Sequence, residues 1–351
     1  MHPRPSSIVA ALYTARDLKV DVAILHGPSG CSFKHARLLE EDGMRVLTTA
    51  LADNEFIFGG QKPLEEVLRY AEDTFSPKRM AVVGTCVAMI IGEDLASAID
   101  SSGISTPTIA VDIHAGYPEN ISGVLATLDA AKEAGWITEE ELARQHRLME
   151  KANEVEKIRG AASQAYIEPS RGDLKHVAAQ RLIELAKSGA KGVAILNAKK
   201  ETAYMFADEL IAIHDACPDA DITYIANLDE RGLPKVRADA QRIRDEMKKR
   251  GVPLELTGAL DEYGANGDAL GARIQEIAPS FAFIVGVPHA IPPEYTNGIE
   301  CFSVTNGPRQ VEPLHAIGHE HVLVEIDLHP KTLGVRSVVE SEFGAVLRSL
   351  A

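Results

Sequence analysis

Two cysteines, Cys31 and Cys86, stand in similar surroundings and are the residues best suited to hold a metal. Each follows a short aliphatic run, at 22–25 and 80–84, and a helical segment is expected after each. Ligands bind at the carboxyl ends of the strands in an open parallel sheet. A helix N-terminus also lowers the pKa of a thiol, which favours the thiolate that metals require. The spacing therefore predicts half of a metal-cluster site.

Three glycines accompany these cysteines, Gly27, Gly30 and Gly84. Because glycine has no side chain, we expect them to form a supporting loop whose backbone can approach a bulky inorganic group. Cys217 follows an expected helix and Cys301 begins an expected strand, so both are interpreted as structural. The alternative for all the cysteines is that they pack as small apolar residues, as buried free thiols commonly do.

The elements that must position these residues alternate between aliphatic runs and helical periodicity, which predicts an α/β fold with mainly parallel sheets flanked by helices. Strands are expected at 22–25, 45–49, 80–84, 108–112, 193–197, 222–227, 281–286, 301–305 and 321–327. Helices are expected from about residue 63, at 138–166 and 174–189, and near 201–214, 235–250 and 268–277. The break at 168–173 predicts an N-terminal αβ domain, 1–170, that carries the cysteines. Residues 171–351 then form a C-terminal αβ region of one or two subdomains with the substrate cleft.

Composition and missing motifs exclude several classes of function. The chain has 351 residues and a formal net charge of −15, which argues against binding nucleic acid or an anionic membrane. No apolar run is long enough to span a membrane, and the first residues lack a signal-peptide pattern. Four cysteines are too few for a disulfide scaffold and favour a reducing, cytoplasmic location. No P-loop, C-x-x-C pair or G-x-G-x-x-G fingerprint is present. The segment 27–31 resembles a nucleophile elbow around Ser29, but Cys31 replaces its last glycine.

Two segments resemble nitrogenase component 1 and its relatives. LHGPSGCSFKHARLLE, at 25–40, is similar to the H-G-P-x-G-C segment of that superfamily, and VGTCVAMIIGEDL, at 83–95, is similar to its T-C-x-x-x-x-I-G-D-D-I segment. Each follows an expected strand, and the resemblance is strong over about residues 20–115. The chain is shorter than nitrogenase subunits and offers two motif cysteines rather than three. It therefore most closely resembles the D component of the Ni-sirohydrochlorin a,c-diamide reductive cyclase of methanogens.

The resemblance implies nitrogenase-like, Rossmann-type domains and an iron–sulfur enzyme. It implies multi-electron ring reduction and lactam formation on Ni-sirohydrochlorin a,c-diamide, in the biosynthesis of the nickel hydrocorphinoid cofactor of methyl-coenzyme M reductase. Electrons would arrive from a separate ATP-dependent reductase that resembles the nitrogenase iron protein (CfbC-like). A cubane cluster usually needs four thiolates, so one 4Fe-4S cluster shared by a homodimer through Cys31 and Cys86 of each chain is expected.

Ring reduction needs a proton for each electron, and imidazoles are suitable donors near neutral pH. The candidates are His289, after the strand at 281–286, and His315, His319 and His321. Arg309 is a candidate for binding a substrate carboxylate through its planar guanidinium.

Three other hypotheses remain at this point. The chain could reduce a different tetrapyrrole on the same scaffold, or it could be a non-catalytic scaffold that carries a metallocofactor. It could also be an ordinary α/β binding protein with two buried thiols.

Overall fold

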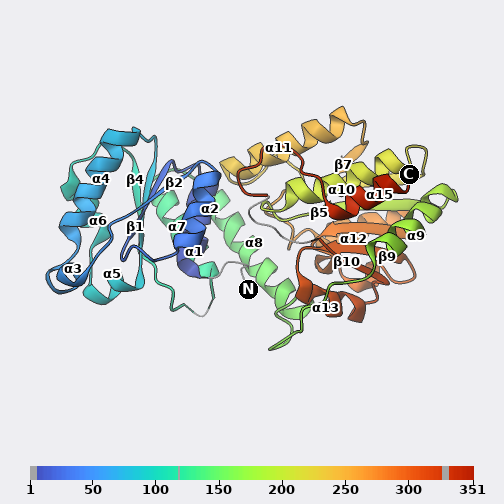
Figure 1. Cartoon of the computed structure of the whole chain (residues 1–351), viewed down its shortest axis with the longest axis horizontal. Helices are drawn as coiled ribbons and strands as arrows, with labels where there is room; N and C mark the ends of the chain where they lie inside the picture. The colour runs from blue at the N-terminus through green and yellow to red at the C-terminus, as the bar shows by residue number, and fades with distance from the viewer. Residues whose placement is uncertain (1–5, 118, 326–331) are drawn as a thin grey trace. The chain divides into compact units, whose positions relative to one another are not determined.

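The structure is a computed structural model that describes residues 6–117, 119–325 and 332–351. Its contacts divide the chain into two compact units (Figure 1). Unit 1 comprises Met1–Met149 and Leu233–Lys235, and unit 2 comprises Glu150–Gly232 and Val236–Ala351. This division falls inside helix α8 (Glu139–Ile158), whereas the sequence placed the boundary at 170/171. Each unit contains one parallel sheet flanked by helices, which confirms the predicted α/β class.

The sheet of unit 1 has the order β2-β1-β3-β4, and the paired strands are parallel. The strands are β1 (Val22–His26), β2 (Arg45–Thr48), β3 (Met80–Gly84) and β4 (Thr108–Val111). The helices of this part of the chain are α1 (Ser7–Asp17), α2 (Phe33–Glu41), α3 (Asp53–Phe58), α4 (Gln61–Phe75), α5 (Cys86–Ile91), α6 (Leu95–Ser102), α7 (Ile121–Glu133) and α8. All four predicted strands are therefore present, within a residue of the expected ends.

Helices cover both faces of the unit 1 sheet. Apolar side chains of α4 and α6, including Leu64, Leu68 and Leu95, pack with Ile24 and Val82 of the central strands. Helices α1 and α7 contact each other, and α1 contacts β3 while α7 contacts β4. Helix α1 was not predicted, because every one of its residues is buried and its sequence shows no polar face.

The sheet of unit 2 has the order β10-β9-β8-β5-β6-β7, again with parallel pairs. Its strands are β5 (Gly192–Asn197), β6 (Ile222–Ala226), β7 (Leu254–Leu256), β8 (Phe281–Gly286), β9 (Glu300–Thr305) and β10 (His321–Val324). The described strands of unit 2 thus form one sheet rather than two. The short strand β7 was not predicted, and residues 326–327 of the strand expected at 321–327 lie outside the described residues.

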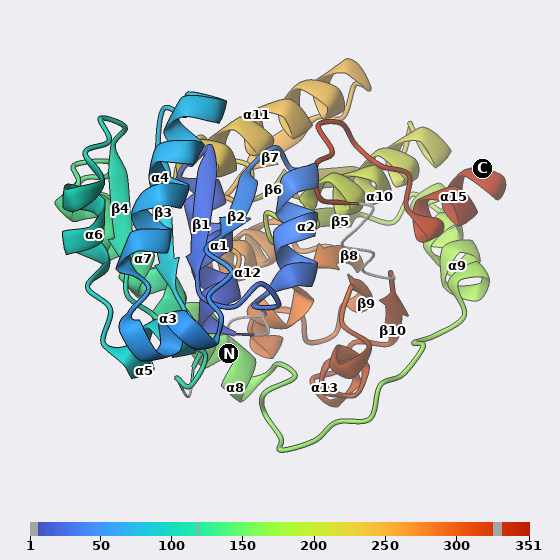
Figure 2. The ribbon, with the colours of Figure 1, turned by 60° about the vertical axis from the view of Figure 1, so that its left-hand side comes forward.

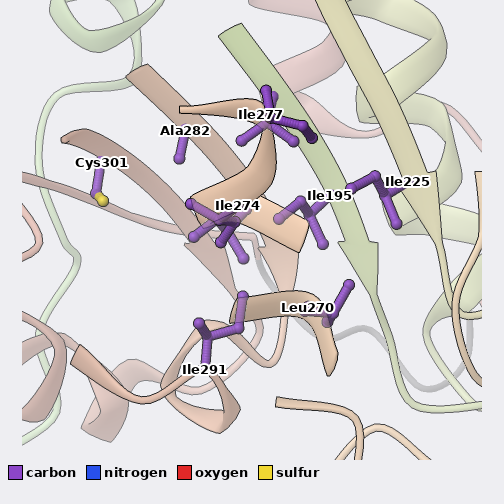
Figure 3. Packing of buried hydrophobic residues seen from close by; sticks show 10 residues of the cluster. Ile195, Ile225, Leu270, Ile274, Ile277, Ala282, Ile291 and Cys301 are labelled. Carbon is purple, nitrogen blue, oxygen red and sulfur yellow. The ribbon is translucent and has the colours of Figure 1, made fainter. Parts of the chain in front are cut away.

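The helices of unit 2 are α9 (Lys175–Lys187), α10 (Ala203–Ala216), α11 (Pro234–Lys249), α12 (Gly267–Ile277), α13 (Val311–Ala316) and α15 (Glu342–Ser349), with short 3-10 turns η1 (Pro288–Ala290), η2 (Pro293–Tyr295) and η3 (Pro308–Gln310). Leu270 and Ile274 of α12 pack against Ile195 of β5 and Ile225 of β6 (Figure 3). Helix α10 contacts β5, β8 and α15, and α15 lies beside α9 (Figure 2). No helix among the described residues is both long and apolar enough to cross a membrane.

Helix α8 ends at Ile158, so the prediction that it continues to residue 166 was wrong. A Cβ atom at Gly160 would collide with the side chain of Glu156, and Arg159 turns to donate to the backbone oxygens of His289, at 2.9 Å, and Ala290, at 3.1 Å. The segment that follows is irregular and runs from α8 to α9 (Figure 2). It is fixed to unit 2 where Ser170 N donates to Pro308 O at 2.9 Å. The prediction was too long because the helical pattern of charged residues continues past Ile158, whereas these tertiary contacts end the helix there.

Glu209 on α10 is fully buried, and neither carboxyl oxygen has a hydrogen-bond partner among the described residues. Burial raises the pKa of this carboxyl well above its ordinary value; Glu325 and Asp208 raise it further, and Lys175 opposes them. The folded protein therefore keeps a proton at pH values where the unfolded chain has lost it. Stability is expected to fall as the pH rises above the unfolded value of 4.5, by up to about 1.4 kcal/mol per pH unit.

Glu209→Gln removes this titration, since the amide stays neutral. The melting temperature of the variant relative to the unchanged protein is expected to increase by a few degrees between about pH 5 and pH 8, as measured by circular dichroism. Glu184→Gln, whose side chain is 69% exposed, is the control and should give a parallel curve. Parallel curves for Glu209→Gln as well would show that this carboxyl does not hold a proton in the folded state.

Candidate metal centre

Strands β1 and β3 are neighbours, and their parallel register aligns His26 with Gly84 at the carboxyl edge of the unit 1 sheet. The Thr85 hydroxyl donates to His26 O at 2.9 Å, which ties the ends of the two strands together. A Cβ atom at Gly27 would collide with the Thr85 side chain, so this contact requires glycine at position 27. The loops that carry the two motif cysteines therefore begin side by side.

Cys31 lies on the first of these loops, and Cys86 begins helix α5 directly after the second. Cys31 N donates to Pro28 O at 3.1 Å in a tight turn before α2, and Cys86 is the first residue of α5. Both thiols are free and half-buried, and they are close enough to influence each other electrostatically. No described atom lies within 4 Å of a Cβ built at Gly30, so the backbone next to Cys31 is open. A Cβ at Gly84 would meet Ile113 O at 3.4 Å. The structure thus brings together the two cysteines that the sequence selected.

A third loop, after β4, reaches the same place and was not predicted. Ala115 N donates to Cys86 Sγ at 3.3 Å, and the rings of His114 and Tyr117 stack with their centroids 4.3 Å apart. Hydrogen bonds to sulfur are one of the ways in which a protein tunes an iron–sulfur cluster. The sequence could have indicated this loop, because residues 114–116 follow the expected strand at 108–112.

The pKa of the Cys31 thiol is raised, whereas the sequence predicted that it would be lowered. Burial raises the pKa of the Cys31 thiol, and the neighbouring Cys86 thiol raises it further. Desolvation of the charged form therefore outweighs any effect of the helix that follows. Since metals bind the thiolate, a metal that bound here would displace a proton from Cys31.

The buried side chains of two polar residues, His26 and Glu93, lie next to the segments that carry the cysteines. His26 is fully buried, with Nδ1 3.2 Å from Thr49 Oγ1 and Nε2 3.5 Å from Glu93 Oε2. Burial lowers the pKa of His26, while Glu93 opposes that change. Glu93 also accepts a hydrogen bond from Gly60 N, and Asp94 caps α6 by accepting from Ser97 N at 2.9 Å. Glu93 and Asp94, the acidic pair of the second motif, therefore bond to backbone amides around the turn after α5.

Large apolar side chains are exposed around the cysteine loops. We call this set the apolar collar; it comprises Phe33, Phe56, Ile57, Phe58, Met89, Ile90 and Tyr117. Phe33 is two residues from Cys31, Met89 and Ile90 belong to the helix that Cys86 begins, and α3 contacts α5 (Figure 1). A concentration of exposed apolar side chains marks an interaction site more often than free surface.

The remaining cysteines lie in packed surroundings. Cys217 and Cys301 are buried, and burial raises the pKa of Cys301 to about 12, so it is a neutral thiol.

Ser29, the centre of the elbow-like segment, is exposed. The histidine nearest to it in sequence, His26, contacts Thr49 and Glu93 instead.

The candidate proton donors and the arginine lie in unit 2. His289 is buried in η1, directly after β8, and both of its ring nitrogens lack a hydrogen-bond partner among the described residues. His315 on α13 is exposed, with Nδ1 2.8 Å from His319 O. Arg309 is exposed, and its guanidinium lies 5.6 Å from the ring centroid of Tyr166. His315 and His319 do not share a helical face, because α13 ends at Ala316.

Comparison with known proteins matches residues 6–135 to the family model described as nitrogenase component 1 type oxidoreductase. The component CfbD of the Ni-sirohydrochlorin a,c-diamide reductive cyclase complex of Methanosarcina acetivorans is 55% identical, over 100% of this chain and 97% of the relative. The corresponding component of Methanothermobacter thermautotrophicus is 49% identical, over 99% and 98%. The solved structure of nitrogenase Cp1 at pH 6.5 is 16% identical, with a TM-score of 0.34 over 92% of this chain and 76% of that one. The chain therefore belongs to the CfbD family, among the oxidoreductases of nitrogenase component 1 type.

Proposed function

We propose that this chain is the catalytic component of an ATP-dependent reductive cyclase that acts on Ni-sirohydrochlorin a,c-diamide, reducing the ring and closing a lactam. The observation that carries the proposal is the pair of free, half-buried thiols on adjoining loops, in a chain 55% identical to a component of that cyclase complex. Electrons reach it from a separate CfbC-like reductase, resembling the nitrogenase iron protein, through a 4Fe-4S cluster.

The residues fit one half of such a cluster. Cys31 and Cys86 supply two of the four thiolates that a cubane usually needs, and Ala115 N–H already points at the Cys86 sulfur. A second copy related by two-fold symmetry supplies the other two, which is the commonest way for identical chains to share a site. The apolar collar supports the same arrangement, because two collars that meet around the thiols would exclude water from the cluster.

The cluster supplies one-electron transfer, and the chain's own residues account for the remaining tasks. Gly27 and Gly30 lie in the loop that holds Cys31, and Gly84 ends strand β3 just before Cys86. In unit 2, His289 and His315 are proposed to donate the protons that accompany the electrons, and Arg309 to bind a substrate carboxylate. A planar guanidinium binds carboxylates through two parallel hydrogen bonds, which suits a substrate with several acidic side chains.

Anaerobic reconstitution tests this function. The chain, a CfbC-like reductase, ATP and the nickel tetrapyrrole are combined, and each component is also omitted in turn. We expect the substrate spectrum to change only in the complete mixture, because this sequence has no phosphate-binding loop of its own. Protein purified without oxygen is expected to hold about four irons and four sulfides per dimer.

Each other result separates the alternatives. Iron and sulfide without turnover would favour a metallocofactor scaffold, and turnover of a different tetrapyrrole would favour another reductase. Protein with neither iron nor turnover would leave an ordinary α/β binding protein. Reduction by this chain and ATP without the reductase would contradict the proposed electron route.

A further inference from the structure

A buried charged cluster lies at the carboxyl edge of the unit 2 sheet, whereas Cys31 and Cys86 belong to unit 1. Glu156, in the last turn of α8, is 8% exposed, and its Oε1 lies 3.2 Å from Lys199 Nζ and 3.4 Å from His289 Nε2. Its Oε2 accepts from Gln310 Nε2 at 3.0 Å. Lys199 follows β5, His289 follows β8, and Gln310 closes the turn after β9. Three neighbouring strand ends therefore converge on one carboxylate.

This carboxyl group is ionised despite its burial. Burial opposes the charge, but Lys199 and then His289 hold the pKa of Glu156 well below its usual range. Burial also opposes the charge on Lys199, yet Glu156, and to a smaller extent Tyr263 and Glu201, raise its pKa above the ordinary value. A buried ion pair of this kind costs desolvation energy and is weak evidence for a purely stabilising role.

His289 is the neighbour of the cluster whose bonding is incomplete. It is 2% exposed, and neither Nδ1 nor Nε2 has a hydrogen-bond partner among the described residues. Its backbone is fixed, since Arg159 Nε donates to His289 O at 2.9 Å. Buried polar atoms are satisfied in most proteins, so an exception calls for an explanation such as a proton-transfer role.

A second buried histidine, His319, has a different environment. His319 Nδ1 lies 2.5 Å from Ser303 Oγ, and His315 contacts the backbone of His319 and, through Nε2 at 3.5 Å, Asp173 Oδ2. Burial, followed by the effects of His289 and His315, lowers the pKa of His319 to about 4. His319 is therefore neutral near pH 7. Of these two buried imidazoles, the contact with a carboxylate belongs to His289.

We propose that Glu156 is a positioning residue for His289. Its carboxylate, fixed by Lys199 and Gln310, takes the proton of Nε2 as a hydrogen bond and thereby selects the tautomer in which Nδ1 carries the free lone pair. The partner of one ring nitrogen sets the protonation of the other in this way. Nδ1 then takes up a proton and releases it, with the N–H electron pair staying on nitrogen, to a site that has received electrons from the reductase. The inference rests on the proposed function, in which His289 donates protons.

The tautomer of His289 can be observed without turnover. The anaerobic protein is labelled with 15N-histidine, and His289→Gln identifies the signals of this ring by their loss. We expect the unchanged protein to show His289 protonated at Nε2. In Glu156→Gln an amide N–H can donate to Nε2, so the proton is expected at Nδ1 or shared between the two nitrogens. An unchanged tautomer in Glu156→Gln would overturn the proposal.

Kinetics separate positioning from packing. Glu156→Gln keeps the side-chain volume but loses the charge, whereas Glu156→Asp keeps the charge and loses a methylene group. Positioning predicts that Gln lowers kcat about 10- to 100-fold with KM nearly unchanged, and that Asp retains more of the activity. A packing role predicts the reverse order, and that order would also overturn the proposal.

Glu300→Gln is the matched control. Glu300 Oε1 lies 3.1 Å from His321 Nε2, at the opposite, amino end of the same sheet. This variant should change the signals of His321, leave those of His289 in place and keep kcat. If the unchanged protein shows the expected tautomer but no preparation turns over, the proposed function fails while the positioning of His289 by Glu156 stands.

Discussion

Replacement of Cys31 or Cys86 by alanine is expected to remove the proposed iron–sulfur cluster and to reduce turnover to background. In a two-fold dimer each substitution removes two of four ligands, one from each chain, and two thiolates are too few to retain a cubane. Iron analysis should fall from about four per dimer to near zero, with loss of the visible absorbance. Both side chains are half-buried, Cys31 in a turn and Cys86 at the first position of α5, so the variants should remain folded by circular dichroism.

Cys217→Ala and Cys301→Ala are the matched controls. Both thiols are buried in unit 2, whereas Cys31 and Cys86 belong to unit 1. They are expected to keep the full iron content, with some loss of thermal stability from the vacated volume. Iron retained by Cys86→Ala but lost from Cys301→Ala would show that the ligands had been assigned to the wrong cysteines.

Aspartate in the apolar collar is expected to convert the proposed dimer into monomers that hold no cluster. Ile57 is 73% exposed on α3, where two collars are proposed to meet. An unpaired charge buried there should weaken association by about 2 kcal/mol or more, which is about 30-fold in Kd. Sedimentation measures the oligomeric state of Ile57→Asp, and iron analysis of each fraction measures the cluster.

Leu174→Asp provides a control of equal exposure, since Leu174 is 74% exposed but precedes α9 in unit 2. It should remain dimeric and keep its iron. A dimer with full iron content in Ile57→Asp would remove the collar from the proposed interface. Monomers that still contain four irons each would contradict the shared cluster itself.

The sequence predicted the parts of the fold that depend on local pattern. Buried parallel strands are continuous aliphatic runs, so β3 and β8 were placed correctly to the residue. The two cysteines were found because each follows such a run, and the register of β1 and β3 then brings their loops together. The boundary between contact units and the length of α8 depend on which segments pack together, and periodicity does not report that.

Other features of the sites are equally non-local. The bond from Ala115 N to Cys86 Sγ joins residues 29 positions apart, and neither the alanine nor its loop has a distinctive composition. Glu156 is one of several acidic residues on a charged helix. Its importance is visible only in the structure, where Lys199 and His289 contact it from the ends of two strands. The lower thiol pKa expected for Cys31 was wrong because burial, which sequence does not quantify, outweighs the helix terminus.

The burial of helix α1 limits when it can fold during synthesis of the chain. Helix α1 is buried against β3 and α7, and the Ser7 hydroxyl bonds to His114 O across 107 residues. The ribosome releases Ser7 early, but its binding place does not exist until β4 and α7 have also emerged. Such long-range closure is slow compared with local helix formation, and domains generally fold as units during synthesis. The loop that donates to Cys86 follows β4 as well, so the proposed metal centre is complete only after most of unit 1 has been translated.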